Sequence, residues 1–173
     1  QAPEDDILNL GHVLSEGGAI NLFAGTVNHG GEISANSLSQ DEFGNIRILA
    51  QSDITLTESS ITSASNQQGD AGSISIESQT GTTLVSGHIA STSASLQGGS
   101  IHILGEQVGI IGHALIDASG RKGGGEILIG GDYRGDNADI KNARASYIGQ
   151  DTLIKSNALE NGSGGKVIVW ADE

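Results

Sequence analysis

The chain has no cysteine, one proline, and only two phenylalanines, two tyrosines and one tryptophan in 173 residues. The absence of cysteine excludes disulfides, thiolate metal sites and cysteine nucleophiles. Because aromatic residues are scarce, the interior must be built from isoleucine, leucine, valine and alanine. Basic residues are also few, 8 against 21 acidic ones, and the formal charge of −13 disfavours nucleic acid and anionic membrane surfaces as partners.

Long apolar runs are missing as well. No stretch approaches the roughly 18 consecutive apolar residues of a membrane span, so we expect no membrane insertion. Residues 1–10 lack the basic start and apolar core of a signal peptide, and we expect any export signal to lie upstream. Regularly spaced isoleucine and valine runs nevertheless predict a folded chain.

A glycine-led apolar alternation recurs six times. The segments are GGAINLFAG (17–25), GNIRILA (44–50), GSISIES (72–78), GGSIHILG (98–105), GGEILIGG (124–131) and GGKVIVWA (164–171). The intervals between their markers are 26, 28, 27, 26 and 40 residues, the markers being Ile20, Ile46, Ile74, Ile101, Ile127 and Val167. Two further apolar clusters lie between successive markers, so each period contains three short strands. We therefore predict an all-β fold, a single-stranded right-handed parallel β-helix of about six rungs.

The repeat also predicts which residues face inward. In each first strand the marker and the residue two positions later share one face, which we assign to the core. In the third strand a large residue is followed two positions later by a small one, in the pairs Ile33/Ala35, Ile61/Ser63, Ile89/Ser91, Ile116/Ala118 and Ile154/Ser156. The glycines before the first strand predict a corner that needs positive φ or a close approach of neighbouring turns.

The organisation of the chain follows from the same repeat. Apolar residues at 7–14 match the second and third strands of a rung, so we expect the chain to begin within a turn. We predict that 1–173 is one β-helix segment of a longer protein, and that the 40-residue interval contains an extra-helical loop at 131–146. Near that loop the outward residues become Leu128, Ile168 and Trp170. We expect the loop to cover them through Tyr133, Ile140 or Tyr147.

Several sequence segments in the C-terminal third resemble those of a known family. They are ALIDASG (114–120), GGGEILIGGDYRG (123–135), SYIGQDTLI (146–154), NGSGGKVIVWADE (161–173) and the tract LGEQVGIIGHALIDASG (104–120). In combination they resemble the β-helical shaft region of filamentous haemagglutinin-like two-partner-secretion exoproteins. The resemblance implies an adhesin that is secreted to the bacterial cell surface through an outer-membrane transporter. The family's amino-terminal secretion domain is not recognisable in the chain, so we expect an internal segment.

This resemblance favours a structural and adhesive shaft, with host-cell, glycan or neighbouring-cell ligands bound through other regions of the protein. An alternative is a subunit that self-associates end to end into an extracellular fibre through its open rung edges. A third is a polysaccharide-active enzyme, which would need converging carboxylates. The outward columns stack none, namely Asn21, Arg47, Ser75, His102, Leu128 and Ile168 in the first strand and Ser34, Thr62, Ala90, Asp117 and Lys155 in the third. We therefore predict no enzyme and assign no catalytic residue.

Three further candidates concern binding. Asp132, Asp136 and Asp139 supply oxygen ligands suited to calcium, although their spacing departs from that of an EF-hand loop and a solvated loop is the simpler interpretation. Arg134-Gly135-Asp136 spells a tripeptide that some integrins recognise on a loop tip, and we keep it as a candidate for receptor binding. The histidines fall at different phases of the repeat, which predicts exposed or turn positions rather than metal ligands, and they are His12, His29, His88, His102 and His113. We assign no cofactor.

Overall fold

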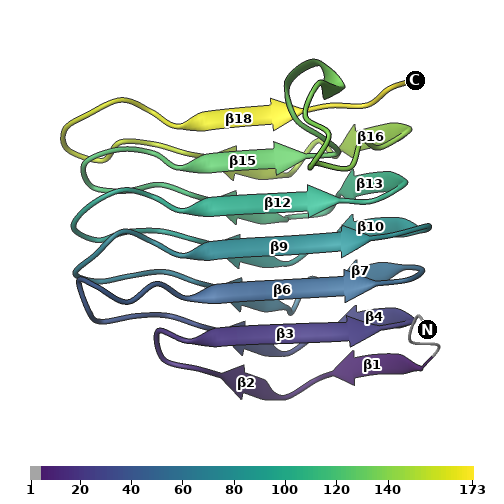
Figure 1. The fold of residues 1–173 in the computed structure, drawn as a ribbon, viewed down its shortest axis with the longest axis horizontal. Helices are drawn as coiled ribbons and strands as arrows, with labels where there is room; N and C mark the ends of the chain where they lie inside the picture. The colour runs from purple at the N-terminus through teal and green to yellow at the C-terminus, as the bar shows by residue number, and fades with distance from the viewer. Residues whose placement is uncertain (1–4) are drawn as a thin grey trace.

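The chain winds into a coil of short parallel strands in the computed structural model, which describes residues 5–173 (Figure 1). The strands form three sheets of six, and each rung contributes one strand to each sheet. No α-helix occurs in the described part of the chain. The predicted parallel β-helix with three strands per rung is confirmed.

The three sheets are named by the order of their strands within a rung. The first sheet contains β3 (Ala19–Ala24), β6 (Asn45–Ala50), β9 (Ser73–Ser78), β12 (Ser100–Leu104), β15 (Glu126–Ile129) and β18 (Lys166–Val169). The second contains β1 (Asp6–Asn9), β4 (Thr26–His29), β7 (Ile54–Leu56), β10 (Thr82–Val85), β13 (Gln107–Ile110) and β16 (Ala145–Ile148). The third contains β2 (His12–Leu14), β5 (Glu32–Ser34), β8 (Ile61–Ser63), β11 (His88–Ala90), β14 (Leu115–Asp117) and β17 (Leu153–Lys155). A short 3-10 helix, η1 (Tyr133–Gly135), lies between β15 and β16.

The six markers stack in register. Successive pairings of the first sheet align them from Ile20 on β3 to Val167 on β18. Between these ends the inward side chains of the first sheet are 0–1% exposed, and they are Ile46, Ile48, Ile74, Ile76, Ile101, Ile103, Ile127 and Ile129. On β18, which no further strand covers, Val167 and Val169 are 44% and 45% exposed. Burial of each large side chain contributes about 1.5–3 kcal/mol, so the stacked rungs supply most of the stabilisation.

The third sheet corrects one predicted position. Thr62, not Ile61, pairs with Ile33 and Ile89, so Thr62 faces the core and Ile61 is 44% exposed. The small inward residue of this rung is accordingly Ala64 rather than Ser63. Side chains alternate along a strand, so an error of one residue exchanges the two faces. The apolar character of Ile61 misled the assignment.

The glycine corner behaves as expected, through close approach. A Cβ on Gly72 would overlap the carbonyl oxygen of Gly44, and a Cβ on Gly125 would overlap that of Gly99. Neither glycine has a positive φ, so contact between rungs, not backbone strain, requires glycine here. Small inward residues complete the corner, because the Ser156 hydroxyl donates to the Gly125 carbonyl at 2.8 Å.

One inward position holds a histidine. His29 on β4 is fully buried, whereas the sequence predicted an exposed or turn position. Its Nε2 lies 3.2 Å from the Ile61 carbonyl oxygen and its Nδ1 lies 3.2 Å from Nδ2 of Asn9, an arrangement that satisfies the neutral ring. Burial lowers the pKa of His29, and backbone hydrogen bonds with Ile61 and Asn9 act in the opposite direction.

Two buried threonines provide a matched test of the core. The Thr62 hydroxyl has no hydrogen-bond partner, whereas the Thr83 hydroxyl donates to the Leu104 carbonyl at 2.7 Å. Because an unpaired buried hydroxyl is costly, Thr62→Val should raise the free energy of unfolding by about 1 kcal/mol. Thr83→Val, which removes a satisfied hydroxyl, should lower it by about 1 kcal/mol. Denaturant unfolding measures both, and equal effects of the two substitutions would contradict the assignment of Thr62.

Candidate binding loop and its ionic anchor

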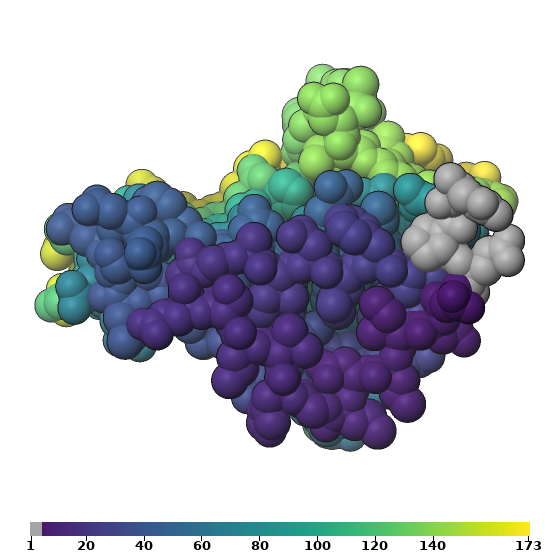
Figure 2. Space-filling model, turned by 60° about the horizontal axis from the view of Figure 1, so that its bottom comes forward, coloured from purple at the N-terminus to yellow at the C-terminus, as the bar shows by residue number. Residues whose placement is uncertain are grey.

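The loop between β15 and β16, residues 130–144, is the main departure from the coil, and Figure 2 shows it as a projection from the body. It leaves through Gly130 and Gly131, whose φ angles of 72° and 147° favour glycine. Its base is closed by a 2.7 Å hydrogen bond from the Ala143 amide to the Gly130 carbonyl. The next strand therefore re-enters the coil in register, with Ile148 on β16 paired to Ile110 on β13.

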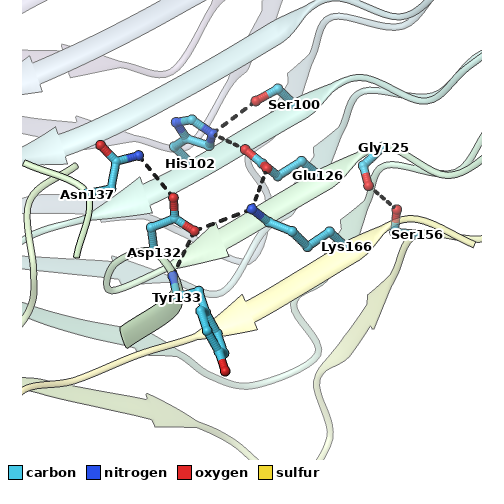
Figure 3. Close-up of polar contacts among 9 residues, drawn as sticks. All are labelled: Ser100, His102, Gly125, Glu126, Asp132, Tyr133, Asn137, Ser156 and Lys166. Carbon is cyan, nitrogen blue, oxygen red and sulfur yellow. Dashed lines mark hydrogen bonds and ion pairs between the residues drawn. The ribbon is translucent and has the colours of Figure 1, made fainter. Parts of the chain in front are cut away.

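Asp132 anchors the start of the loop. Its Oδ1 accepts a hydrogen bond from the Tyr133 amide at 2.7 Å, and its Oδ2 accepts one from Nδ2 of Asn137 at 3.0 Å (Figure 3). Nζ of Lys166, on β18, lies 3.3 Å from Oδ1. The hydrogen bonds from Asn137 and the Tyr133 amide, with the nearby ammonium of Lys166, hold the pKa of Asp132 at about 2.

Lys166 connects this anchor to the first sheet. Its Nζ lies 2.9 Å from Oε2 of Glu126, its register partner on β15. The other oxygen of Glu126 lies 3.0 Å from Nε2 of His102 on β12, so the network crosses three rungs (Figure 3). Burial acts to raise the pKa of Glu126, but hydrogen bonds from Lys166 and His102 bring it below its ordinary value. The contact with Glu126 raises the pKa of Lys166.

The loop folds back against the apolar outward patch, but not through the predicted tyrosines. Leu128 faces outward from the first sheet and is only 1% exposed, two residues after the anchored Glu126. Tyr133 and Tyr147 are 62% and 63% exposed, so the expectation that they cover the patch is wrong. Tyr147 points outward from the second sheet, and Tyr133 lies in the turn of η1.

Glycines bring the loop close to the end of the last strand. A Cβ on Gly131 or Gly135 would lie about 3 Å from the Trp170 side chain, at 2.9 and 3.1 Å respectively. The Trp170 carbonyl accepts a 2.6 Å hydrogen bond from the Ser146 hydroxyl. The half-buried Trp170 therefore packs against loop backbone that larger residues would displace.

The tripeptide Arg134-Gly135-Asp136 forms a tight turn. Arg134 and Gly135 have φ angles of 60° and 66°, and the Asp136 amide donates to the Tyr133 carbonyl at 3.4 Å. Both charged residues are exposed, and the Arg134 guanidinium lies over the Tyr133 ring, 5.1 Å from its centroid. The turn therefore displays both charges, and receptor binding through it stays a prediction.

The calcium candidates are not brought together. Asp132 is occupied by the anchor, and the Asp139 amide donates to the side-chain oxygen of Asn137. Within the described residues 5–173, no three acidic, histidine or cysteine side chains form a group suited to a metal ion. The geometry gives calcium at Asp132, Asp136 and Asp139 no support.

The pairing of Glu126 with Lys166 was missed in the sequence, although the register contained the signal. Glu126 and Lys166 occupy the same position in successive first strands, where an opposite-charge pair is favourable. The third sheet repeats this arrangement, with Nζ of Lys155 3.1 Å from Oδ2 of Asp117. His12 and Glu32 form a further register pair, at 2.9 Å.

Comparisons with known proteins show what the chain is similar to. No protein-family model matches the chain, and no curated protein matches it. A solved structure does: the crystal structure of the HMW1 secretion domain from Haemophilus influenzae is 31% identical, with a TM-score of 0.63, over 99% of this chain. The resemblance to filamentous haemagglutinin-like two-partner-secretion exoproteins is confirmed. The chain spans 38% of that structure's length.

The match also bears on the expectation of an internal segment. That expectation rested on finding no secretion domain in the sequence, whereas the similar structure is itself described as a secretion domain. Among residues 5–173 there is no helix with the length and hydropathy needed to cross a bilayer.

The Asp132 anchor predicts a pH-dependent loop. A carboxyl whose folded pKa lies near 2, below the ordinary 3.8, stabilises the loop above the ordinary value and loses that effect as the pH falls toward 2. Amide exchange in residues 130–144, compared with that of the core strands, should therefore rise over this interval. Asn137→Ala should raise the pKa of Asp132 in an NMR titration, and Asp139→Asn, a change in an exposed carboxylate of the same loop, should leave it near 2.

The tripeptide has a separate test. Receptor recognition would depend on the reach of the Asp136 carboxylate, so Asp136→Glu, which keeps the charge, should reduce cell attachment at least about tenfold, as expected for a charged hydrogen bond of 1.5–3 kcal/mol. Asp139→Glu on the same loop is the control. Unchanged attachment by the Asp136 variant would remove the tripeptide as a candidate.

Proposed function

We propose that the chain is part of the rigid β-helical shaft of an adhesin-like exoprotein, secreted to the cell surface by two-partner secretion. The observation that carries the proposal is the unbroken register of three six-stranded ladders around one aliphatic core. Such a coil resists bending because every rung is hydrogen-bonded to the next. The similarity to a secretion domain supports the export route.

The shaft spaces and displays other regions of the protein, and those regions bind the host cell, glycan or neighbouring cell. Its partner during export is an outer-membrane transporter of the two-partner-secretion type. The similar structure is named as a secretion domain rather than as an enzyme, which supports a non-enzymatic role. End-to-end self-association through the rung edges stays a prediction.

A second candidate function follows from the same match. The chain is similar to a secretion domain over 99% of its length, which favours a direct part in recognition by the transporter. The two candidates differ in what they require of the surface. A shaft needs only intact rungs, whereas a recognition module needs particular outward residues in particular rungs.

Removing one whole rung from the full-length protein separates the two. Deletion of residues 74–100 joins Ser73 to Ile101 and preserves the register, because Ile74 and Ile101 are partners. A shaft with one rung fewer should still fold, be exported and support attachment. Export to the medium and attachment of cells are the measurements, and a folded protein that is no longer exported would favour the recognition module.

Deletion of residues 74–99 is the matched control. It removes one residue fewer and puts Ser100 where Ile74 had faced the core, so every following side chain in the strand changes face. This variant should lose the cooperative unfolding transition and be degraded. If both deletions behaved alike, the shaft proposal would fail, because it depends on register rather than on length.

A further inference from the structure

A groove of about 530 Å³ follows the corner where each third strand leads into the next first strand. It crosses four rungs, from Phe43 before β6 to Glu126 at the start of β15. Its volume lies within the range of small-ligand sites, which combine an apolar surface with a few polar groups. The binding loop at 130–144 contributes no lining residue.

Backbone forms the floor of this groove. Gly44, Gly72, Gly99 and Gly125 lie there. A Cβ on any of the last three would overlap the carbonyl oxygen of the preceding glycine, and a Cβ on Gly44 would overlap that of Ala35. Because packing of the coil requires glycine at these positions, the glycines alone do not indicate a ligand. Their consequence is an even floor along the coil axis, open to a ligand that lies across several rungs.

One wall presents a ladder of polar side chains. Asn45, Ser73, Ser100 and Glu126 are successive register partners in the first sheet, and all four line the groove. Rungs are spaced about 4.8 Å apart, so the ladder extends about 14 Å. Hydrogen-bonding groups thus recur at a distance close to the length of one sugar unit in an extended glycan.

The N-terminal end of the groove carries an aromatic side chain. Phe43 is 53% exposed and lines the groove, so its aromatic ring contributes little to packing of the core. Aromatic rings offer a flat apolar surface against which the C–H face of a pyranose packs, while its hydroxyls bond to neighbouring polar groups. At the opposite end, the hydrogen bonds from Lys166 and His102 keep Glu126 ionised as a strong acceptor.

Charge restricts the ligand. Glu126 is the one charged residue that lines the groove, no basic residue does, and the chain as a whole carries −13. An anionic glycan would meet the Glu126 carboxylate, whereas the Lys166 ammonium does not line the groove and is already paired with that carboxylate. An extended peptide is also disfavoured, because the glycine amides already donate within the coil, Gly72 to the Ala64 carbonyl and Gly99 to the Ser91 carbonyl.

We propose that this corner groove binds a neutral oligosaccharide along the coil axis, with one sugar ring against Phe43 and the following hydroxyls on the ladder from Asn45 to Glu126. The site differs from the tripeptide turn. It also does not depend on the export route, so its failure would leave the shaft proposal intact.

Calorimetric titration of the chain with neutral tetrasaccharides of glucose, galactose, mannose and N-acetylglucosamine tests the proposal. At least one should bind, and Phe43→Ala should weaken that binding by up to about tenfold, the range of one aromatic contact. Ser73→Leu, which fills the middle of the groove, should abolish it. Asn45→Ala provides a second, surface-exposed variant if Ser73→Leu does not fold.

Ser75→Leu is the matched control. Ser75 faces outward from the same strand two residues later and does not line the groove, so its substitution should leave the affinity unchanged. Equal losses from Ser73→Leu and Ser75→Leu would overturn the proposal, as would the absence of binding to all four tetrasaccharides. Stronger binding of a sulfated tetrasaccharide or of an extended peptide would contradict the chemistry assigned to the ligand.

Discussion

Parallel pairing in register between successive rungs is the constraint on which the rest of this structure depends. Because every strand pairs with the equivalent strand one period away, each residue lies directly over a residue of the same phase. A single position therefore becomes a column that runs the length of the coil. Isoleucine in such a column forms a continuous core and glycine forms a corner. A side chain that does not fit its column disturbs the packing of both neighbouring rungs.

The architecture could be predicted from the sequence because spacing alone determines it. Six markers at nearly constant intervals identify the first strands, and alternation assigns their faces without any knowledge of loops. The same logic failed at Ile61, where apolar character was given more weight than spacing. In other rungs, an even number of residues separates the last inward position of the second strand from the inward position of the third strand. This separation is four from Val85 to Ile89 and six from Ile110 to Ile116. Six residues after Leu56 is Thr62, whereas Ile61 would break the parity.

Other features could not be predicted because they depend on partners distant in the sequence. His29 occupies a core position only because partners one rung on either side satisfy its ring: the Asn9 side-chain amide donates to Nδ1, and the Ile61 carbonyl accepts from Nε2. Composition gives no sign of this, and an isolated histidine suggests the surface. The path of the loop is another example. Its tyrosines suggested an apolar cover, yet its position is determined by Asp132 and Lys166, which are 34 residues apart.

The loop and the groove show how one repeated corner can acquire different chemistry. Packing of the rungs requires glycine at the corner and leaves the outward side chains of the first strand free to vary. Near the C-terminal end those side chains are Glu126 and Lys166, and they hold a loop against the sheet. In the rungs before it they are Asn45, Ser73 and Ser100, which line the groove beside the glycine floor. Since Glu126 belongs to both arrangements, the ion pair that secures the loop also fixes the carboxylate at the end of the groove. A change in the anchor would consequently alter the groove, although no loop residue lines it.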